Sequence, residues 1–368
     1  MGIKIENYAE GFKYVSLALD EQTKKDLIED ELDFIFLDKK ELFLFPSRIK
    51  LEINADGICE LLHHNNYDVY EIWPDGRMYL RYDTTSVDNY FFVTGKCNSN
   101  CIMCPSPDYT RKNGDETNIE NLITLAKHIP SDSPHLTITG GEPFLSGEDI
   151  FKFIFLLREK FHKTECLFLT NGRIFALDKY AKMLRDSIPN NSILAIPIHA
   201  STAELHDRIT QTKGSFSQTI LGIKRLLRYG IRIEIRIVVS KVNCEDINNL
   251  AEFIIREIPQ VEYISVIAME MTGNAFKNKD RLWIPYKEAF YYASDAINKL
   301  INNGIDVKLY NFPLCTVDPS CWMICERSIS PNKVRYSENC DGCNYKQSCG
   351  GVFAGTINIE RDELKAII

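Results

Sequence analysis

Short apolar runs alternate with longer stretches of helical spacing along residues 89 to 310 of the chain. The runs are rich in β-branched residues, which predicts strands near 90–94, 135–139, 165–170, 192–198, 231–239, 262–268 and 305–310. The stretches between them predict helices over 151–161, 217–229, 244–258 and 286–303. Ser146, with Asp149 after it, is the expected N-cap of the first of these helices. Because strands that alternate with helices build parallel sheets, the pattern predicts an α/β fold.

Residues 1–88 show a mixed pattern and form a separate α+β region of unknown role in our interpretation. Residues 68–82 predict a β-hairpin, with Pro74-Asp75-Gly76 as its turn. We expect this region to pack as a collar against the main domain, and a peptide-recognition module is the alternative. We expect His63 and His64 to lie in a solvated loop rather than in a metal site. Cys59 stands alone in the sequence, and we expect it to be buried as a small apolar residue.

Composition narrows the class of protein. The chain has 368 residues, a net charge of −8 and 12 cysteines, so it is long enough for two or three domains. Charged residues break its apolar stretches, and no secretion signal opens it, so we expect a cytoplasmic protein that does not bind membranes. The acidic balance argues against sequence-independent nucleic-acid binding. Clustered cysteines in a chain of this length favour metal ligation over disulfides.

Three of the cysteines, Cys97, Cys101 and Cys104, stand in one short loop directly after the first predicted strand of the α/β segment. A [4Fe–4S] cluster normally takes four thiolates, so three ligands leave one iron open for another molecule. A zinc knuckle or plain packing is the alternative. For zinc, the nearest additional ligand, His128, lies inside a predicted helix beyond a polar loop.

The Cys97-x3-Cys101-x2-Cys104 spacing resembles the signature of radical S-adenosylmethionine (SAM) enzymes. Gly140-Gly141-Glu142-Pro143, at the end of the next predicted strand, is similar to that family's motif for the amino group of SAM. The resemblance implies a partial (β/α)6 barrel over 89–310 with its site at the carboxyl ends of the strands. We expect both glycines to let the backbone approach a ligand and Glu142 to accept an ammonium group, and helix capping is the alternative for Glu142.

Position nominates further SAM contacts. Asn171, after the third predicted strand, would bond the ribose or orient the methionyl group, or simply form a turn. Ser201 and Arg236 resemble the family's ribose and carboxylate contacts, but Arg236 alternates with Glu234 and an ion pair within the sheet is equally expected. His199 and His206 lie near the same rim and are more simply read as structural histidines than as general bases. Cys166 and Cys244 are isolated, and we expect neither to be a ligand.

The region 311–368 holds six cysteines, at 315, 321, 325, 340, 343 and 349. The segment resembles the SPASM and twitch extensions of radical SAM enzymes, in which auxiliary clusters follow the barrel. Phe353 stands where the full SPASM pattern has its next cysteine, so two complete clusters are not expected. We assign one auxiliary [4Fe–4S] cluster to Cys315, Cys340, Cys343 and Cys349, with Cys321 or Cys325 as the other candidates for the fourth ligand. A structural zinc site is the alternative.

Other segments are similar to the HxsC-type maturases of the His-Xaa-Ser peptide system, among them Leu169-Thr-Asn-Gly-Arg173, Leu205-His-Asp-Arg-Ile209 and Tyr310-Asn-Phe-Pro-Leu-Cys315. This resemblance implies a peptide-modifying enzyme with a precursor peptide as substrate, a second radical SAM protein as partner and an external electron donor of the flavodoxin or ferredoxin type. It also implies that a reduced cluster cleaves SAM to a 5′-deoxyadenosyl radical, which abstracts hydrogen from the peptide. The auxiliary cluster would accept the electron left when an oxidative cross-link closes.

Two other functions fit the same residues. One is a twitch-type dehydrogenase or rearrangement enzyme that acts on a small molecule. The other, from a different class, is a cluster-binding scaffold or redox sensor without turnover. The Gly-Gly-Glu-Pro motif counts against a sensor, because a sensor has no need to chelate SAM.

Overall fold

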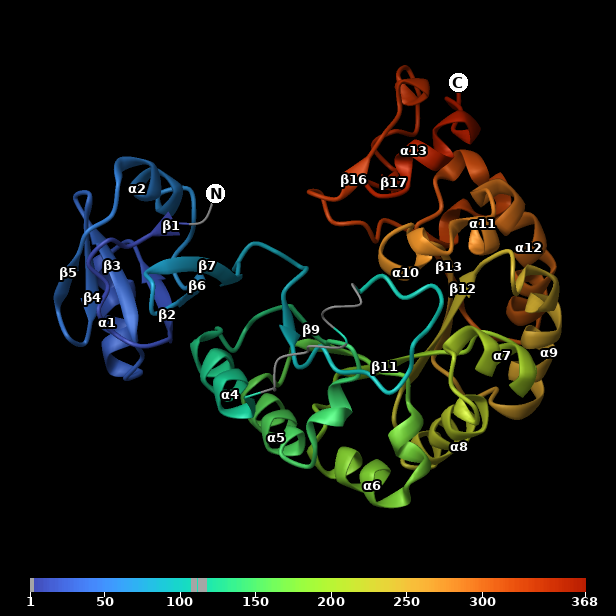
Figure 1. Ribbon diagram of the computed structural model, residues 1–368, viewed down its shortest axis with the longest axis horizontal. Coiled ribbons are helices and arrows are strands. Elements are labelled where there is room, and N and C mark those ends of the chain that lie inside the picture. The colour runs from blue at the N-terminus through green and yellow to red at the C-terminus, as the bar shows by residue number, and fades with distance from the viewer. Residues whose placement is uncertain (1–2, 107–110, 112–117) are drawn as a thin grey trace.

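The computed structural model describes residues 3–106, 111 and 118–368, and these form two large sheets and a tail with a small two-stranded sheet (Figure 1). A seven-stranded sheet of order β1-β7-β6-β2-β3-β4-β5 occupies the N-terminal region. Its strands are β1 (Ile3–Lys4), β2 (Lys13–Ala18), β3 (Phe34–Asp38), β4 (Glu41–Phe45), β5 (Ile49–Leu51), β6 (Val69–Ile72) and β7 (Arg77–Tyr82). Its helices are α1 (Glu21–Glu29) and α2 (Ala55–Leu61).

The predicted hairpin is present as β6 and β7. Gly76 takes a φ of 82° in its turn, and the N–H of Gly76 donates to the carbonyl of Trp73 at 2.8 Å. A positive φ is the conformation that glycine adopts without steric cost. The expectation for Cys59 is wrong, because this residue lies exposed on α2. The short helix turns one face to the sheet through Ile58 and Leu61, and Cys59 points away from that face.

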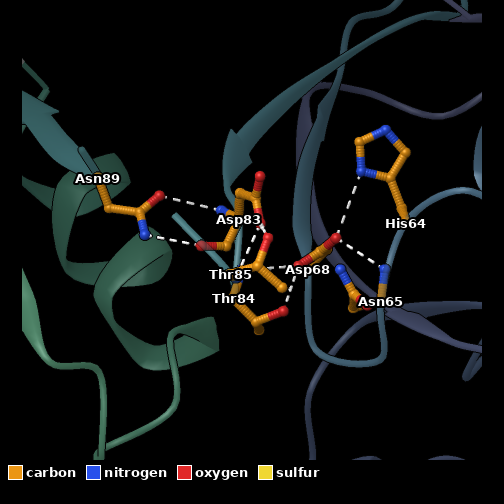
Figure 2. A network of polar contacts seen from close by, with 7 residues as sticks. All are labelled: His64, Asn65, Asp68, Asp83, Thr84, Thr85 and Asn89. Atoms are coloured by element: carbon orange, nitrogen blue, oxygen red, sulfur yellow. Dashed lines mark hydrogen bonds and ion pairs between the residues drawn. The ribbon is translucent and has the colours of Figure 1, made fainter. Parts of the chain in front are cut away.

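A hydrogen-bonded linker joins this region to the second sheet (Figure 2). The buried carboxylate of Asp68 accepts the N–H and the hydroxyl of Thr84, both at 2.8 Å, and lies 3.3 Å from Nδ1 of His64. Asn89 accepts the N–H of Asp83 at 3.0 Å and donates to its carbonyl at 2.8 Å. The 83–89 segment is therefore bonded to the N-terminal region at Thr84, and the bonds between Asp83 and Asn89 hold its two ends together.

The second sheet is parallel throughout, has eight strands and curves into a half-barrel of order β15-β14-β13-β12-β11-β10-β9-β8 (Figure 1). Seven strands confirm the predicted ones: β8 (Tyr90–Phe92), β9 (His135–Thr139), β10 (Glu165–Leu169), β11 (Ser192–Pro197), β12 (Ile233–Val239), β13 (Tyr263–Ala268) and β14 (Val307–Tyr310). The eighth, β15 (Cys325–Glu326), comes from the cysteine-rich region and was not predicted. Its two residues are too few to show a period.

Helices cover the convex side of the half-barrel. They are α4 (Ile119–His128), α5 (Ile150–Lys160), α6 (Asp178–Ser187), α7 (Ala203–Thr210), α8 (Ser215–Arg228), α9 (Ile247–Glu257) and α12 (Tyr286–Asn302). Two short helices, α10 (Gly273–Lys277) and α11 (Lys279–Leu282), instead follow β13 at the rim where the strands end. The prediction of Ser146 as the N-cap of α5 is wrong, because Ser146 ends a separate 3-10 turn, Pro143–Ser146, and the α5 cap position falls on Asp149. Apolar residues between strands and helices form the main core, in which the rings of Phe91 and Phe153 lie 5.0 Å apart. The α/β half-barrel of the prediction is confirmed.

The tail packs back onto the half-barrel. Beyond β15 it contains β16 (Val334–Arg335), β17 (Val352–Phe353) and α13 (Ile357–Glu360). Glu360 is fully buried and accepts the N–H of Tyr286 at 3.1 Å, and the hydroxyl of Thr356 accepts the N–H of Met271 at 3.0 Å. Within the described ranges, no helix has the length and apolar character to cross a membrane.

Candidate functional site

The loop of Cys97, Cys101 and Cys104 lies at the carboxyl end of β8, on the rim where the other strands also end. All three thiols are free and partly buried. Burial raises the pKa of Cys101 to about 12 and raises the pKa of Cys97, and the nearby thiols add to both shifts. A metal must therefore replace the protons if this loop is to present thiolates.

Two asparagines from distant sequence hold the loop. Asn274 donates its side-chain N–H to the carbonyl of Cys101 at 3.1 Å and its main-chain N–H to the carbonyl of Cys104 at 2.8 Å. Asn278 donates to the carbonyl of Ile102 at 2.9 Å. These bonds fix the main chain of the loop that carries the three thiols.

The Gly-Gly-Glu-Pro segment packs directly against the approach to this loop. A Cβ on Gly140 would lie 2.4 Å from the carbonyl oxygen of Thr94, and one on Gly141 would lie 2.4 Å from that of Lys96. The N–H groups of Gly141 and Glu142 donate to those same two carbonyls at 2.7 and 2.8 Å. Both glycines are therefore needed for a close approach to the chain's own backbone, and the approach of a ligand to them stays a prediction.

Glu142 is 1% exposed and accepts three hydrogen bonds. They come from the N–H of Phe144 at 3.2 Å, the hydroxyl of Thr170 at 2.7 Å and the N–H of Asn171 at 2.7 Å. Burial raises the pKa of its carboxyl, and these donors oppose the rise. Glu142 thus caps the 3-10 turn Pro143–Ser146, as the alternative reading expected, and it also joins two strand ends. A bond from Glu142 to an ammonium group stays a prediction.

Asn171 connects Glu142 to the cysteine loop. Besides donating its N–H to Glu142, it donates its side-chain amide to Oδ1 of Asn98 at 2.7 Å. Asn98 lies between Cys97 and Cys101 in the sequence. Arg173 donates to the carbonyl of Asn98 at 2.7 Å and to the hydroxyl of Ser99 at 3.0 Å. Gly172 has a φ of 72°, so the segment also forms the turn that was the alternative for Asn171.

The other predicted SAM contacts have partners within the protein. Ser201 donates its hydroxyl and its N–H to Asp246, both at 2.6 Å. Arg236 forms the ion pair with Glu234 that sequence alternation suggested, with Nε to Oε1 at 2.8 Å. Ser265 and Tyr263 also donate to Glu234, at 2.6 and 3.2 Å. A contact of Ser201 or Arg236 with SAM stays a prediction.

His199 and His206 are buried, and Nδ1 of His206 accepts the N–H of His199 at 3.2 Å. Burial lowers the pKa of His199 to about 3 and that of His206 to about 4. Both rings are therefore uncharged near neutral pH, as expected of structural histidines. Cys166 and Cys244 are buried in the main core, where neither joins the other cysteines.

Four cysteines of the tail line one small cavity of about 20 Å³: Cys315, Cys340, Cys343 and Cys349. Cys321 and Cys325 do not line it, and instead lie beside each other, with the Cys325 thiol donating to the carbonyl of Cys321 at 3.6 Å. Main-chain N–H groups point at sulfur in the cavity: Leu314 and Gly351 donate to Cys349, and Ile367 donates to Cys343, each at 3.4 Å. This donor set suits thiolates held by a metal cluster. Among the residues described, no three His, Cys, Asp or Glu side chains are close enough to hold a single metal ion.

A larger cavity of about 1100 Å³ lies along the concave face of the half-barrel. It runs from His135 and Glu165, at the amino ends of the strands, to Thr139 and Asn311 near the carboxyl ends. Tail residues 328 and 330–333 and linker residues 83 and 86–88 close its sides. Of the predicted SAM contacts, Arg236 lines it. The cavity has room for a substrate beside the site.

Sequence reasoning missed Asn274, Asn278, Asp246 and Arg173. The two asparagines lie about 170 residues from the loop that they hold, in a stretch without motif spacing. The Leu-Thr-Asn-Gly-Arg run did contain Arg173, but no pattern showed that it bonds the cysteine loop. Only the folded arrangement reveals these partners.

Residues 91–254 match the sequence profile described as radical SAM superfamily. GTP 3′,8-cyclase of Helicobacter pylori (strain J99) is 29% identical over 176 residues, which cover 47% of this chain and 53% of the cyclase. The antilisterial bacteriocin subtilosin biosynthesis protein AlbA of Bacillus subtilis (strain 168) is 30% identical over 166 residues, or 44% of this chain and 35% of AlbA. The chain thus spans about half the length of the cyclase and about a third of AlbA.

A solved structure shares the fold. Streptococcus suis SuiB bound to S-adenosylmethionine superposes with a TM-score of 0.51 at 16% identity, over 68% of this chain and 53% of SuiB. At this identity the likeness concerns the fold alone. It agrees with the curved parallel sheet of β8 to β15.

Proposed function

We propose, from the radical SAM superfamily domain that residues 91–254 form, that this chain reductively cleaves SAM and modifies a peptide. The observation that carries the proposal is the loop of Cys97, Cys101 and Cys104, whose three partly buried thiols stand on the strand-end rim beside Glu142. Three thiols hold a [4Fe–4S] cluster with one open iron, which is the position that SAM requires.

The residues present fit these groups. The loop supplies thiols whose carbonyl neighbours are already bonded to Asn274 and Asn278, so the ligands are oriented before a cluster arrives. When bound, a reduced cluster with SAM supplies a hydrogen-abstracting 5′-deoxyadenosyl radical, and a second cluster in the tail supplies an electron acceptor. Glu142 and Asn171 set the distance between the loop and the ends of β9 and β10.

In our proposal the auxiliary cluster binds at the small cavity of the tail. Cys315, Cys340, Cys343 and Cys349 are its four ligands in our proposal, because they share one cavity that Cys321 and Cys325 do not line. Cys315 is therefore favoured as the fourth ligand over those two.

The substrate is a ribosomally made precursor peptide with His-Xaa-Ser units, as the HxsC-type resemblance implies, and the product carries an oxidative cross-link. AlbA, whose name assigns it to bacteriocin biosynthesis, supports a peptide substrate. A second radical SAM protein and a flavodoxin or ferredoxin are the partners in this proposal. The chain then acts as an oxidoreductase.

A small-molecule substrate is the second candidate, since GTP 3′,8-cyclase is similar over a comparable stretch. The two candidates differ in what consumes the radical. Peptide-dependent hydrogen abstraction favours the first, and turnover with a nucleotide favours the second.

The test is an anaerobic reconstitution with iron and sulfide, followed by SAM, dithionite and an assay of 5′-deoxyadenosine. We expect about eight irons per chain and cleavage that Cys101→Ala abolishes. Cys244→Ala, which changes a buried thiol that lines neither the tail cavity nor the 1100 Å³ cavity, is the matched control and should cleave SAM normally. A fully loaded protein without cleavage would favour the scaffold or sensor, and zinc in the tail would remove the proposed electron acceptor.

A further inference from the structure

The cysteine loop has an exposed side between its first two cysteines, where Asn98 and Asn100 are both exposed. The end of α7 lies against this side, because the N–H of Asn100 donates to the carbonyl of Thr210 at 3.0 Å. The hydroxyl of Thr212, in the turn between α7 and α8, donates to the carbonyl of Asn98 at 3.5 Å. Surface groups of this turn therefore lie close to the cysteine loop.

Three cations flank the exposed side of the loop. Arg173 donates to the carbonyl of Asn98 at 2.7 Å and to the hydroxyl of Ser99 at 3.0 Å. Arg208, near the end of α7, and Lys213, in the turn that follows, are both exposed. Neither Arg208 nor Lys213 forms an ion pair with a residue that the structure describes. We call Arg173, Arg208 and Lys213 the loop-side basic surface.

Two carboxylates of α7 lie near this surface and leave it positive. Asp207 accepts the hydroxyl of Ser215 at 2.8 Å and the N–H of Phe216 at 2.9 Å, so its charge is bonded to the start of α8. Glu204 is exposed at the other end of α7, about 9 Å along the helix from Thr210. Beside the loop, three positive charges thus face one negative charge, on a chain whose net charge is −8.

The chemistry of the proposed function requires a partner at this loop. Cleavage of SAM consumes one electron, which comes from outside the chain. Electron transfer through protein weakens steeply with distance, so the donor must dock close to the cysteines. A positive surface attracts a negatively charged partner and orients its approach. Electron-transfer encounters are weak and use small interfaces, which a surface of three cations can supply.

We propose that the loop-side basic surface docks an acidic one-electron carrier protein, which delivers the electron for SAM cleavage at Cys97, Cys101 and Cys104. The carrier is oxidised by one electron. The sulfonium of SAM is reduced by it, and its C–S bond breaks to give methionine and the 5′-deoxyadenosyl radical, with no proton transferred. The proposal rests on the proposed function and adds where the electron enters the chain.

The first test measures binding and needs no turnover. The probe is a strongly acidic recombinant flavodoxin in its oxidised form, titrated calorimetrically into the cluster-loaded full chain. The variant is Arg208→Glu with Lys213→Glu, and Arg173 is kept because it bonds the loop. Lys163→Glu with Arg228→Glu is the matched control, because it reverses one exposed lysine and one exposed arginine away from the loop.

We expect the loop-side variant to raise the Kd of flavodoxin about tenfold or more at about 0.05 M salt, because charges at an interface act over about a Debye length. The difference should shrink at about 0.5 M salt, where that length is shorter. The control variant should bind flavodoxin as wild type does.

The second test compares two reductants. With flavodoxin reduced by NADPH and its reductase, and kept below saturation, 5′-deoxyadenosine formation by the loop-side variant should fall by the same factor as binding. With dithionite, which needs no docking surface, the variant should cleave SAM as wild type does.

An absence of flavodoxin binding at low salt overturns the proposal, and so does equal weakening by both variants, which would reflect net charge alone. Loss of dithionite-driven cleavage in the loop-side variant also overturns it, because that result assigns the two cations a structural role. Failure of the proposed function is distinct from these outcomes, since wild type would then form no 5′-deoxyadenosine with dithionite.

Discussion

Single polar residues hold the strand ends of this protein together, and one of them, Glu142, is buried. Glu142 accepts three bonds from two segments, the turn that follows it and residues 170–171, and Asn171 in turn bonds the cysteine loop. A buried carboxylate depends on each of its donors, because a lost hydrogen bond is not replaced by solvent. This dependence makes the contributions of individual donors measurable.

Replacing Thr170 by valine leaves the shape of the side chain nearly unchanged but removes two hydrogen bonds, the 2.7 Å bond to Glu142 and the 3.1 Å bond accepted from the N–H of Gly172. We expect the free energy of unfolding to fall by about 1–3 kcal/mol, since part of a buried carboxylate loses its donor. Urea unfolding measures the change. Thr124→Val, at an exposed helix position, is the control, and an equal loss in both variants would contradict the role given to Glu142.

Asn274→Ala removes the side-chain bond to the carbonyl of Cys101 at 3.1 Å. We expect iron affinity or SAM cleavage to fall about 10- to 100-fold, the usual effect of losing a residue that orients metal ligands. Iron content after dialysis against a chelator reports it. Asn303→Ala, which loses a comparable bond to a helix carbonyl far from the loop, should retain its iron.

The cysteines of the site could be predicted from the sequence, whereas the residues that bond the cysteine loop could not, and the difference has a physical reason. Cysteine ligands lie close together in sequence because one short loop must reach one cluster, so spacing shows them. The residues that hold the loop have no such constraint, and Asn274 reaches it from 173 positions away. Ser201 and Arg236 were nominated by position, but the sequence alone did not show the bond of Ser201 to Asp246.

At the level of elements, the parallel strands were predictable and the tail was not. Buried strands such as β13 are nearly continuous apolar runs, which a sequence displays clearly. Strand β15 has two residues, and β16 and β17 also have two each, so no period exists to read. Contacts with the half-barrel, such as the bond from Tyr286 to Glu360, rather than local preference, fix the path of this region.

The arrangement of the tail separates its cysteines into two groups that alanine variants distinguish. Cys315→Ala is expected to lower the iron content by about four per chain, because Cys315 lines the cavity with three other thiols. Cys321→Ala should leave the iron content unchanged. Iron and sulfide analysis after reconstitution decides between them, and the reverse pattern would assign the fourth ligand to Cys321.

At the scale of the whole molecule, Glu360 couples the docking of the tail to pH. Burial raises the pKa of its carboxyl to about 8, although the N–H of Tyr286 opposes the rise. Because the folded chain binds this proton more tightly than the unfolded chain, its stabilising effect is complete at acid pH. The effect declines as pH rises from the usual range of a carboxyl through about 8.

We expect the free energy of unfolding to decrease by a few kcal/mol, in order of magnitude, between about pH 5 and pH 9. In Glu360→Gln the side chain is neutral at every pH, so this part of the slope should disappear. Anaerobic urea unfolding across the range measures both. Glu338→Gln, an exposed carboxylate of the same region, should keep the slope of wild type.

The place of β15 in the half-barrel has a consequence for synthesis on the ribosome. β14 ends at Tyr310, and the strand that pairs with it begins at Cys325. Until that segment leaves the exit tunnel, the nascent half-barrel presents β14 as an uncovered edge, which is where unfinished sheets associate with other chains. The cysteine-rich tail therefore completes the sheet last, and translation that halts before residue 325 would release a product prone to aggregation.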